Sequence, residues 1–203
     1  MKVIFVDTET GGIDPNKVSI LTFNALVCEF KESGSFKILD SLNLKLKPDD
    51  GCYHVNAEAL AINGIDLVEH NKEAISIADG NLKLYRYLRD HTTKERMVCV
   101  GQHIHFDLEH MFMSGLIEER KFYTFMDKKV IDILTLASMA MLMGLIPRNQ
   151  SCKLKDLAKY LGVPVDEKKL HDASYDNELA ANVFSKMFKL FRAGQPEIDN
   201  DSI

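Results

Sequence analysis

Residues 3–12, which read Val-Ile-Phe-Val-Asp-Thr-Glu-Thr-Gly-Gly, constrain the fold more than any other stretch. The apolar, largely β-branched start predicts a buried strand. Asp7 and Glu9 follow it one residue apart, so their side chains share one face of that strand. Like charges held together repel unless protons or a cation lie between them, and hard carboxylate oxygens suit Mg²⁺ or Mn²⁺. The alternative is that both carboxylates lie in a solvated loop, and the rest of the chain has to decide.

The pattern of the remaining chain predicts an α/β fold. Residues 18–30 are apolar and β-prone, and a polar turn leads into residues 36–47, where leucines alternate with polar residues. Residues 97–100 form a short apolar run that ends at Gly101, as expected for a parallel strand entered from a helical crossover. One more strand is expected within residues 122–125. We therefore expect a mixed sheet, three antiparallel strands plus parallel strands, flanked by helices.

Helical patterns follow the strands and carry recognisable caps. Asn56, Asp132 and Asp172 each precede such a pattern, and short polar side chains there can accept hydrogen bonds from the first free N–H groups. Residues 133–146 are the most apolar segment but too short for a membrane span, so we interpret them as a buried core helix whose methionines at 139, 141 and 143 fill the core. Helices are expected over residues 56–62, 73–91, 105–115, 133–144, 153–162 and 173–193.

Length and composition favour one globular domain. At 203 residues and 46% hydrophobic content we expect a single domain over residues 1–194 and a short, frayed acidic tail over residues 195–203. The net charge of -5 argues against a protein that coats duplex DNA or an anionic membrane, but it does not exclude an enzyme that acts on nucleic acid. The four cysteines lie far apart and no signal peptide is recognisable, so we expect a cytoplasmic protein with reduced thiols and no membrane association.

Two further segments place acids where a metal site would need them. Asp107 opens a helix soon after the strand at 97–100, near the carboxyl edge of the sheet, where ligands bind in open α/β folds. His171 and Asp176 begin the last helix five residues apart, and on one continuous helix they would be separated by about 140°. Both can face one site only if His171 lies on the loop before the helix, and Asp172 as the N-cap places the boundary there.

Three motifs in this order resemble the DEDDh (DnaQ-like) 3′-to-5′ exonucleases, which include proofreading subunits of polymerases, RNase T and oligoribonuclease. The motifs are Asp7-x-Glu9, Asp107 within His-x-Phe-Asp, and His171-x-Ala-x-x-Asp176. The resemblance covers nearly the whole chain and implies a ribonuclease-H-like fold. It implies that the four acids bind two Mg²⁺ or Mn²⁺ ions and that His171 is the general base that deprotonates the attacking water. Paired ions roughly 4 Å apart can stabilise both ends of an in-line displacement at phosphorus.

The resemblance also implies a substrate and a partner. The expected substrate is the single-stranded 3′ end of DNA, released as nucleoside 5′-monophosphates in proofreading or end trimming, and the candidate partner is a DNA polymerase or replication assembly. An exoribonuclease of the RNase T or oligoribonuclease type is the alternative. The residues expected to contact the substrate are Thr8, Thr10, Gly11, Asn56, His103 and Phe106.

Two other interpretations compete with this one. His103-x-His105-x-Asp107 also resembles the start of a metallo-β-lactamase zinc motif, but Leu108 stands where that motif continues with histidine. A module that binds nucleic acid or a polymerase without cleaving would be expected to have lost a catalytic position, and all five are present. His103 departs from the family pattern, in which Asn is common. The other histidines are expected to be exposed or hydrogen-bonded, namely His54, His70, His91 and His110.

Overall fold

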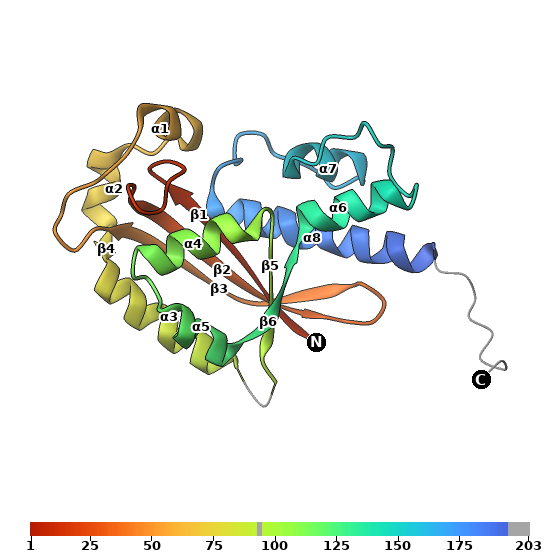
Figure 1. Cartoon of the computed structure of the whole chain (residues 1–203), viewed down its shortest axis with the longest axis horizontal. Helices are drawn as coiled ribbons and strands as arrows, with labels where there is room; N and C mark the ends of the chain where they lie inside the picture. Colours follow the sequence, from red (N-terminus) through yellow and green to blue (C-terminus); the bar gives the residue numbers. More distant parts are fainter. Residues whose placement is uncertain (93–94, 195–203) are drawn as a thin grey trace.

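The computed structural model describes residues 1–92 and 95–194, and within them six strands form one sheet (Figure 1). The sheet order is β4-β3-β2-β1-β5-β6. Strand β2 pairs antiparallel with both β1 and β3, and the other neighbouring strands pair in parallel. The strands are β1 (Lys2–Thr10), β2 (Ile20–Phe30), β3 (Phe36–Lys47), β4 (Ile75–Ser76), β5 (Met97–Gly101) and β6 (Met126–Asp132). The expected tail over residues 195–203 lies outside the described residues.

Strand β1 lies in the middle of the sheet because its sequence suits burial on both faces. The four residues before Asp7 are at most 1% exposed, and they alternate between two separate hydrophobic cores. The pairing with β2 places Asp7 opposite Asn24, whereas the pairing with β5 extends only to Phe5. Asp7 and Glu9 therefore lie beyond the β5 pairing, at the end of a strand that is otherwise enclosed.

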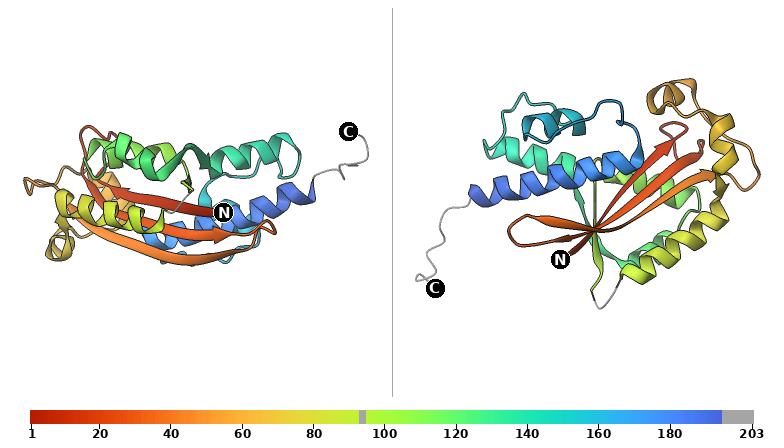
Figure 2. Two further views of the ribbon diagram at one scale, coloured as in Figure 1. Left: turned by 90° about the horizontal axis from the view of Figure 1, so that it is seen from below. Right: turned by 180° about the vertical axis from the view of Figure 1, so that it is seen from behind.

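Helices cover both faces of the sheet (Figure 2). One core joins β1 to α3, α4 and α5, and the other joins β1 to α6, α7 and α8. The helices are α1 (Ala57–Asn63), α2 (Leu67–Glu73), α3 (Ile77–His91), α4 (Ile104–Met113), α5 (Glu119–Phe125), α6 (Ile133–Leu142), α7 (Leu154–Tyr160) and α8 (Ala173–Ala193). The expected mixed sheet flanked by helices is confirmed.

The helix expected over residues 73–91 is wrong in its first part. Helix α2 ends at Glu73, the two-residue strand β4 follows, and α3 begins at Ile77 with the Ser76 hydroxyl accepting from the N–H of Asp79. Strand β4 pairs in parallel with the end of β3. Its local sequence does not predict a strand, because the stabilising hydrogen bonds come from a distant segment.

The strand expected within residues 122–125 is also wrong. These residues end α5, and the strand β6 starts immediately after them. Phe122 is fully buried, with its ring centroid 5.6 Å from that of Phe112. The aromatic residues that favour a strand in isolation are used here as core contacts of a helix, so tertiary packing overrides local preference.

Two of the three expected caps are confirmed. The side chain of Asp132 accepts from the N–H of Leu134, and that of Asp172 accepts from the N–H of Tyr175. Asn56 does precede α1, but its side chain makes no cap hydrogen bond.

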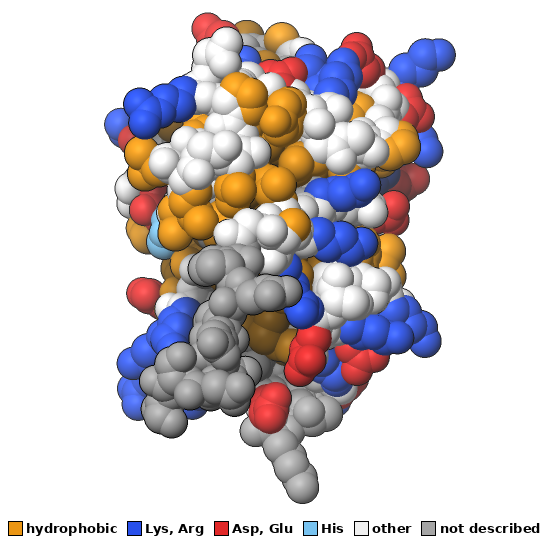
Figure 3. Space-filling model, turned by 90° about the vertical axis from the view of Figure 1, so that its right-hand side faces the viewer, with side chains coloured by type: hydrophobic (Ala, Val, Ile, Leu, Met, Phe, Trp, Pro, Cys, Tyr) orange, Lys and Arg blue, Asp and Glu red, His pale blue; other side chains and the backbone are white. Residues whose placement is uncertain are grey.

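Helix α6 is less buried than its apolar sequence indicates. Its buried side consists of Ile133, Ala137 and Ala140, a stripe at helical spacing. Met139 and Met143 are 49% and 56% exposed, so their expected role in the core is wrong. Apolar side chains are visible on the surface at this end of the molecule (Figure 3). In the described part of the chain, none of the helices has the length and apolar character needed to cross a membrane.

Candidate active site

Strand β1 and helix α4 bring the first three acids together at one edge of the sheet. Asp7 and Glu9 end β1 on the same face, and Asp107 lies in the first turn of α4 with 3% exposure. Oδ1 of Asp107 accepts hydrogen bonds from the hydroxyl and the backbone N–H of Thr8, at 2.7 Å and 2.9 Å. Thr8, which lies between the two β1 acids, thus fixes α4 against β1.

The start of α8 brings His171 and Asp176 to the same place. His171 lies before the helix with φ of 66°, and its backbone N–H donates to Oδ2 of Asp176 at 3.0 Å. Asp172 caps the helix between them. Ligand atoms of Glu9, His171 and Asp176 lie within 4.8 Å of one another. The expectation that His171 must precede the helix to reach this site is met.

Burial and mutual repulsion make the acids of this cluster reluctant to ionise. Burial, and then the charges of Asp107, Glu9 and Asp176, raise the pKa of Asp7 well above its usual value. Burial and the charge of Asp176 raise the pKa of Glu9 to about 8. Burial raises the pKa of Asp107 to about 7, although the hydrogen bonds from Thr8 act in the opposite direction. Burial also raises the pKa of Asp176, against the hydrogen bond from His171.

The donor set fits a divalent cation. The Oδ1 atom of Asp176 is buried and has no hydrogen-bond partner among the described residues, and such an oxygen is costly unless something binds it. Clustered carboxylates with raised pKa values gain most from a cation, because it removes the repulsion between them. The carboxylates of the cluster offer hard oxygen ligands, which suit Mg²⁺ or Mn²⁺.

A comparison with known families decides the class of this site. The family model described as an exonuclease, RNase_T, matches residues 4–184, a range that includes both β1 acids, Asp107, His171 and Asp176. The chain belongs to the DEDDh exonuclease family. It is thereby a 3′-to-5′ exonuclease, a hydrolase of phosphodiester bonds.

The exonuclease has similar relatives among curated proteins. Ribonuclease T of Marinobacter nauticus is 28% identical over 193 residues, which cover 93% of this chain and 83% of the relative. Ribonuclease T of Blochmanniella pennsylvanica is 28% identical over 187 residues, 91% of this chain and 82% of the relative.

Solved structures share its fold. Exonuclease I of E. coli, in complex with a dT13 oligonucleotide, superposes with a TM-score of 0.72 at 18% identity over 95% of this chain and 43% of that one. This exonuclease therefore spans less than half the length of exonuclease I. The nuclease domain of 3′hExo, a DEDDh family member bound to rAMP, superposes with a TM-score of 0.67 at 19% identity over 95% of this chain and 92% of that domain.

The residues expected to contact substrate around β1 have other partners in this exonuclease. The Thr8 hydroxyl donates to Asp107, and the Thr10 hydroxyl donates to the carbonyl of Gly12 at 2.7 Å. A Cβ on Gly11 would lie 2.3 Å from a backbone carbonyl of residue 54, so only glycine permits this close approach. The N–H of Asn56 donates to the carbonyl of Gly11 at 2.7 Å. These residues shape the end of β1, and the two threonine hydroxyls already donate their protons within the protein.

His103 and Phe106 lie at the start of α4 beside the acid cluster. His103 has φ of 60°, and its backbone N–H donates to Oδ1 of Asp132 at 2.8 Å. Among residues other than glycine, Asn, Asp and His are the ones that adopt this left-handed conformation most readily. The His103 ring stacks on that of Phe106 with centroids 6.4 Å apart, and Phe106 lies 4.2 Å from the ring of His110. His103 is exposed, and Phe106 is partly buried.

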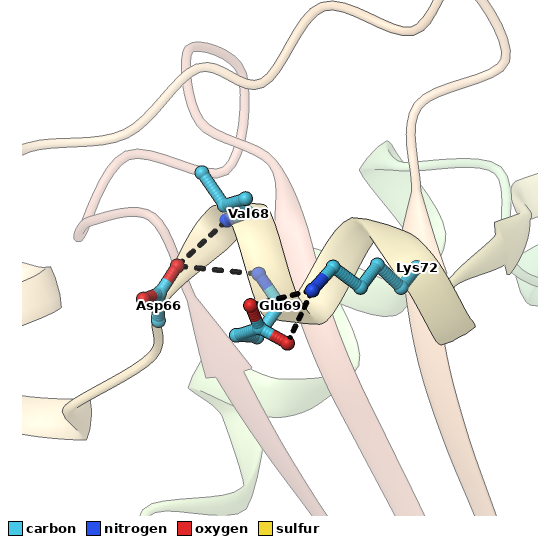
Figure 4. A network of polar contacts seen from close by, with 4 residues as sticks. All are labelled: Asp66, Val68, Glu69 and Lys72. Carbon is cyan, nitrogen blue, oxygen red and sulfur yellow. Dashed lines mark hydrogen bonds and ion pairs between the residues drawn. The ribbon is translucent and has the colours of Figure 1, made fainter.

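A groove of about 1060 Å³ extends from Glu9 and His171 over the ends of β2 and β3 to helix α2. Asp66 caps α2 by accepting from the N–H groups of Val68 and Glu69, and Lys72 forms an ion pair with Glu69 at 2.6 Å (Figure 4). Exposed ion pairs of this kind contribute only about 0–1 kcal/mol to the free energy of unfolding. Such a lysine can therefore leave its carboxylate partner and bind a phosphate instead. The lysines that line the groove are Lys45, Lys72, Lys83, Lys168 and Lys169.

Sequence reasoning missed two buried asparagines at this site, Asn24 and Asn177. Both lie next to a predicted site residue: Asn24 opposite Asp7 in the sheet, and Asn177 directly after Asp176 in α8. Their contact joins segments 153 residues apart, and no local pattern signals it.

Proposed function

We propose that this exonuclease removes nucleotides one at a time from single-stranded 3′ ends of DNA by a two-metal reaction. The observation that carries the proposal is the convergence of four carboxylates and one histidine at the end of β1. A cluster of this kind without a functional role would only lower the stability of the fold, because burial and repulsion disfavour every charge in it.

Asp7, Glu9, Asp107 and Asp176 are the residues that would hold the two ions, Mg²⁺ or Mn²⁺. The bound ions would supply a hydroxide at neutral pH and stabilise charge on the departing 3′ oxygen. His171 is exposed at the rim of the cluster and is fixed there through its backbone N–H. We assign it the general-base role, in which its imidazole takes the proton of the attacking water.

The substrate preference follows from charge and shape. At a net charge of -5 the exonuclease lacks the basic surface needed to bind a long duplex through its phosphates. The lysines of the groove, the exposed ring of His103 and the partly buried ring of Phe106 suit a few unpaired nucleotides, which bind by phosphate contacts and stacking. A duplex end would first have to be unstacked and opened, at a cost of a few kcal/mol.

RNA is the second candidate substrate, and the similarity to ribonuclease T favours it. Association with a DNA polymerase and a cytoplasmic location remain predictions from the sequence.

A time course on matched 5′-labelled DNA and RNA oligomers, with Mg²⁺ or Mn²⁺, tests the proposal. We expect a ladder that shortens from the 3′ end and leaves circular single strands intact. Binding measured with Ca²⁺ should show a salt dependence equivalent to only about two or three phosphates. Cleavage of a circular strand, or a slope equivalent to about eight phosphates, would contradict the proposal. Faster decay of the RNA oligomer would select the second candidate.

A further inference from the structure

A buried pair of amides fixes the first turn of α8 to the sheet, next to the acid cluster. Asn177 is 1% exposed, and Asn24 of β2 is fully buried. Nδ2 of Asn177 donates to Oδ1 of Asn24 at 2.6 Å and to its backbone carbonyl at 3.0 Å. A buried amide with two such bonds is held in one orientation, because losing them would leave polar groups unpaired.

The orientation of Asn24 is fixed from its other side as well. Its Nδ2, which carries two hydrogens, has three acceptors of β3 within hydrogen-bond distance: Oγ of Ser41 at 3.0 Å, the carbonyl of Leu42 at 3.3 Å and Oδ1 of Asn43. With the amide nitrogen engaged by β3, the amide oxygen must face α8. A row of hydrogen-bonded side-chain amides therefore runs from α8 across β2 to β3.

This row of amide hydrogen bonds lies next to the acid cluster. Asn24 is the cross-strand partner of Asp7. Consecutive residues on a helix are about 100° apart, so Asn177 can meet β2 while Asp176 faces the acid cluster. The bonds between Asn177 and Asn24 therefore fix the position and rotation of α8 against the sheet. They thereby fix the position of the Asp176 carboxylate.

We propose that Asn177 and Asn24 are positioning residues that hold Asp176 in register with Asp7 and Glu9 and thereby set the affinity for divalent cations. This inference rests on the metal-binding role proposed above for the acids. Residues that orient metal ligands typically change metal affinity or activity by about 10- to 100-fold when removed.

Titration of the exonuclease with Mn²⁺, followed by electron paramagnetic resonance, tests the inference without an activity assay. Asn177→Ala should weaken Mn²⁺ binding by about 10- to 100-fold. At saturating Mn²⁺ its KM for a DNA oligomer should stay near the wild-type value. The matched control is Ser185→Ala on the same helix, because Ser185 is 7% exposed and its hydroxyl donates to the carbonyl of Gly34 at 2.6 Å. This control should lose thermal stability but keep its Mn²⁺ affinity.

The double variant Asn24→Ala with Asn177→Ala should bind Mn²⁺ about as weakly as Asn177→Ala alone, since the two residues act as one unit. Mn²⁺ affinity in Asn177→Ala equal to that of Ser185→Ala would overturn the inference and leave the proposed function standing. A wild-type protein that binds no Mn²⁺ would overturn the proposed function itself. If Asn177→Ala does not fold, Asn177→Ser is measured by the same criterion.

Discussion

The hydroxyl and the backbone N–H of Thr8 donate to one and the same oxygen of Asp107. The two bonds join β1 to α4 across 99 residues of sequence. Hydrogen bonds to a carboxylate favour its charged form, so they lower the pKa of Asp107 while burial, the larger effect, raises it to about 7.

Thr8→Val should therefore raise the pKa of Asp107 further while it keeps the shape of the side chain. We expect Mn²⁺ binding near pH 7 to weaken by about 10-fold, the lower end of the range for residues that support metal ligands. The loss should shrink as the pH rises and Asp107 ionises, which calorimetric titrations across this pH range would show. Thr124→Val is the control, because the Thr124 hydroxyl donates to the carbonyl of Lys121 on the exposed side of α5. Equal pH profiles in the two variants would contradict the role given to Thr8.

Asp176→Asn should abolish most activity with little change in shape. The neutral amide cannot replace a carboxylate ligand, and we expect turnover on a labelled oligomer to fall by at least about 100-fold. Without metal, the variant should be as stable as wild type or more so, because one buried repulsive charge is removed. Asp90→Asn, at an exposed ion pair with Arg89, should leave activity unchanged. Near-normal turnover in Asp176→Asn would exclude Asp176 as a ligand.

The metal-free protein should lose stability as the pH rises. The folded-state pKa of Glu9 is raised to about 8 and that of Asp107 to about 7, above the usual values of 4.5 and 3.8. The folded protein therefore holds protons that the unfolded chain has already released, and its stability falls between about pH 4 and pH 8. Thermal melts in a chelator should show Tm declining toward pH 8, and added Mn²⁺ should raise Tm most at the alkaline end. Glu9→Gln should flatten the decline, and a Tm that rises with pH across this range would refute the assignment.

Replacement of His171 should separate catalysis from metal binding. If His171 is the general base, its loss should lower turnover by about 100- to 10,000-fold while Mn²⁺ affinity is retained. Asn is the better substitute than Ala, because φ at this position is 66° and Asn tolerates that conformation. His91→Asn, at an exposed pair with Asp40, is the control and should keep full turnover. Loss of Mn²⁺ binding in His171→Asn as severe as in Asp176→Asn would make His171 a ligand instead.

The parts that the sequence predicts well are those with local signals. The strand before Asp7 is apolar on both faces, and α8 has both its cap at Asp172 and its long apolar stripe. The five motif residues, which come together as expected, are identified by their resemblance to the three motifs of the family. The sequence does not predict helix α2 or strand β4: the helix expected over residues 73–91 starts where α2 ends, and the break at β4 depends on pairing with β3.

The features of the site that the sequence does not predict also depend on contacts between distant segments. Asn24 and Asn177 have polar side chains in apolar surroundings, and only the fold shows that each is the hydrogen-bond partner of the other. The contact of Thr8 and Thr10 with substrate, through backbone or side-chain groups, stays a prediction. The inward direction of their hydroxyls depends on where Asp107 and Gly12 lie, which no local pattern signals. Exposure of Met139 likewise depends on which side of α6 meets the sheet.

Two of the acids stand on a strand with hydrogen-bonded neighbours on both sides, whereas α1 and the segment before α8 pair with no strand of the sheet. Opening β1 requires separating the whole sheet, so the backbone amides around Phe5 should exchange with deuterated solvent only by global unfolding. We therefore expect the surrounding helices and loops to move when different substrates bind. The β1 carboxylates stay fixed, and the 3′ end of each nucleic-acid strand is aligned against them.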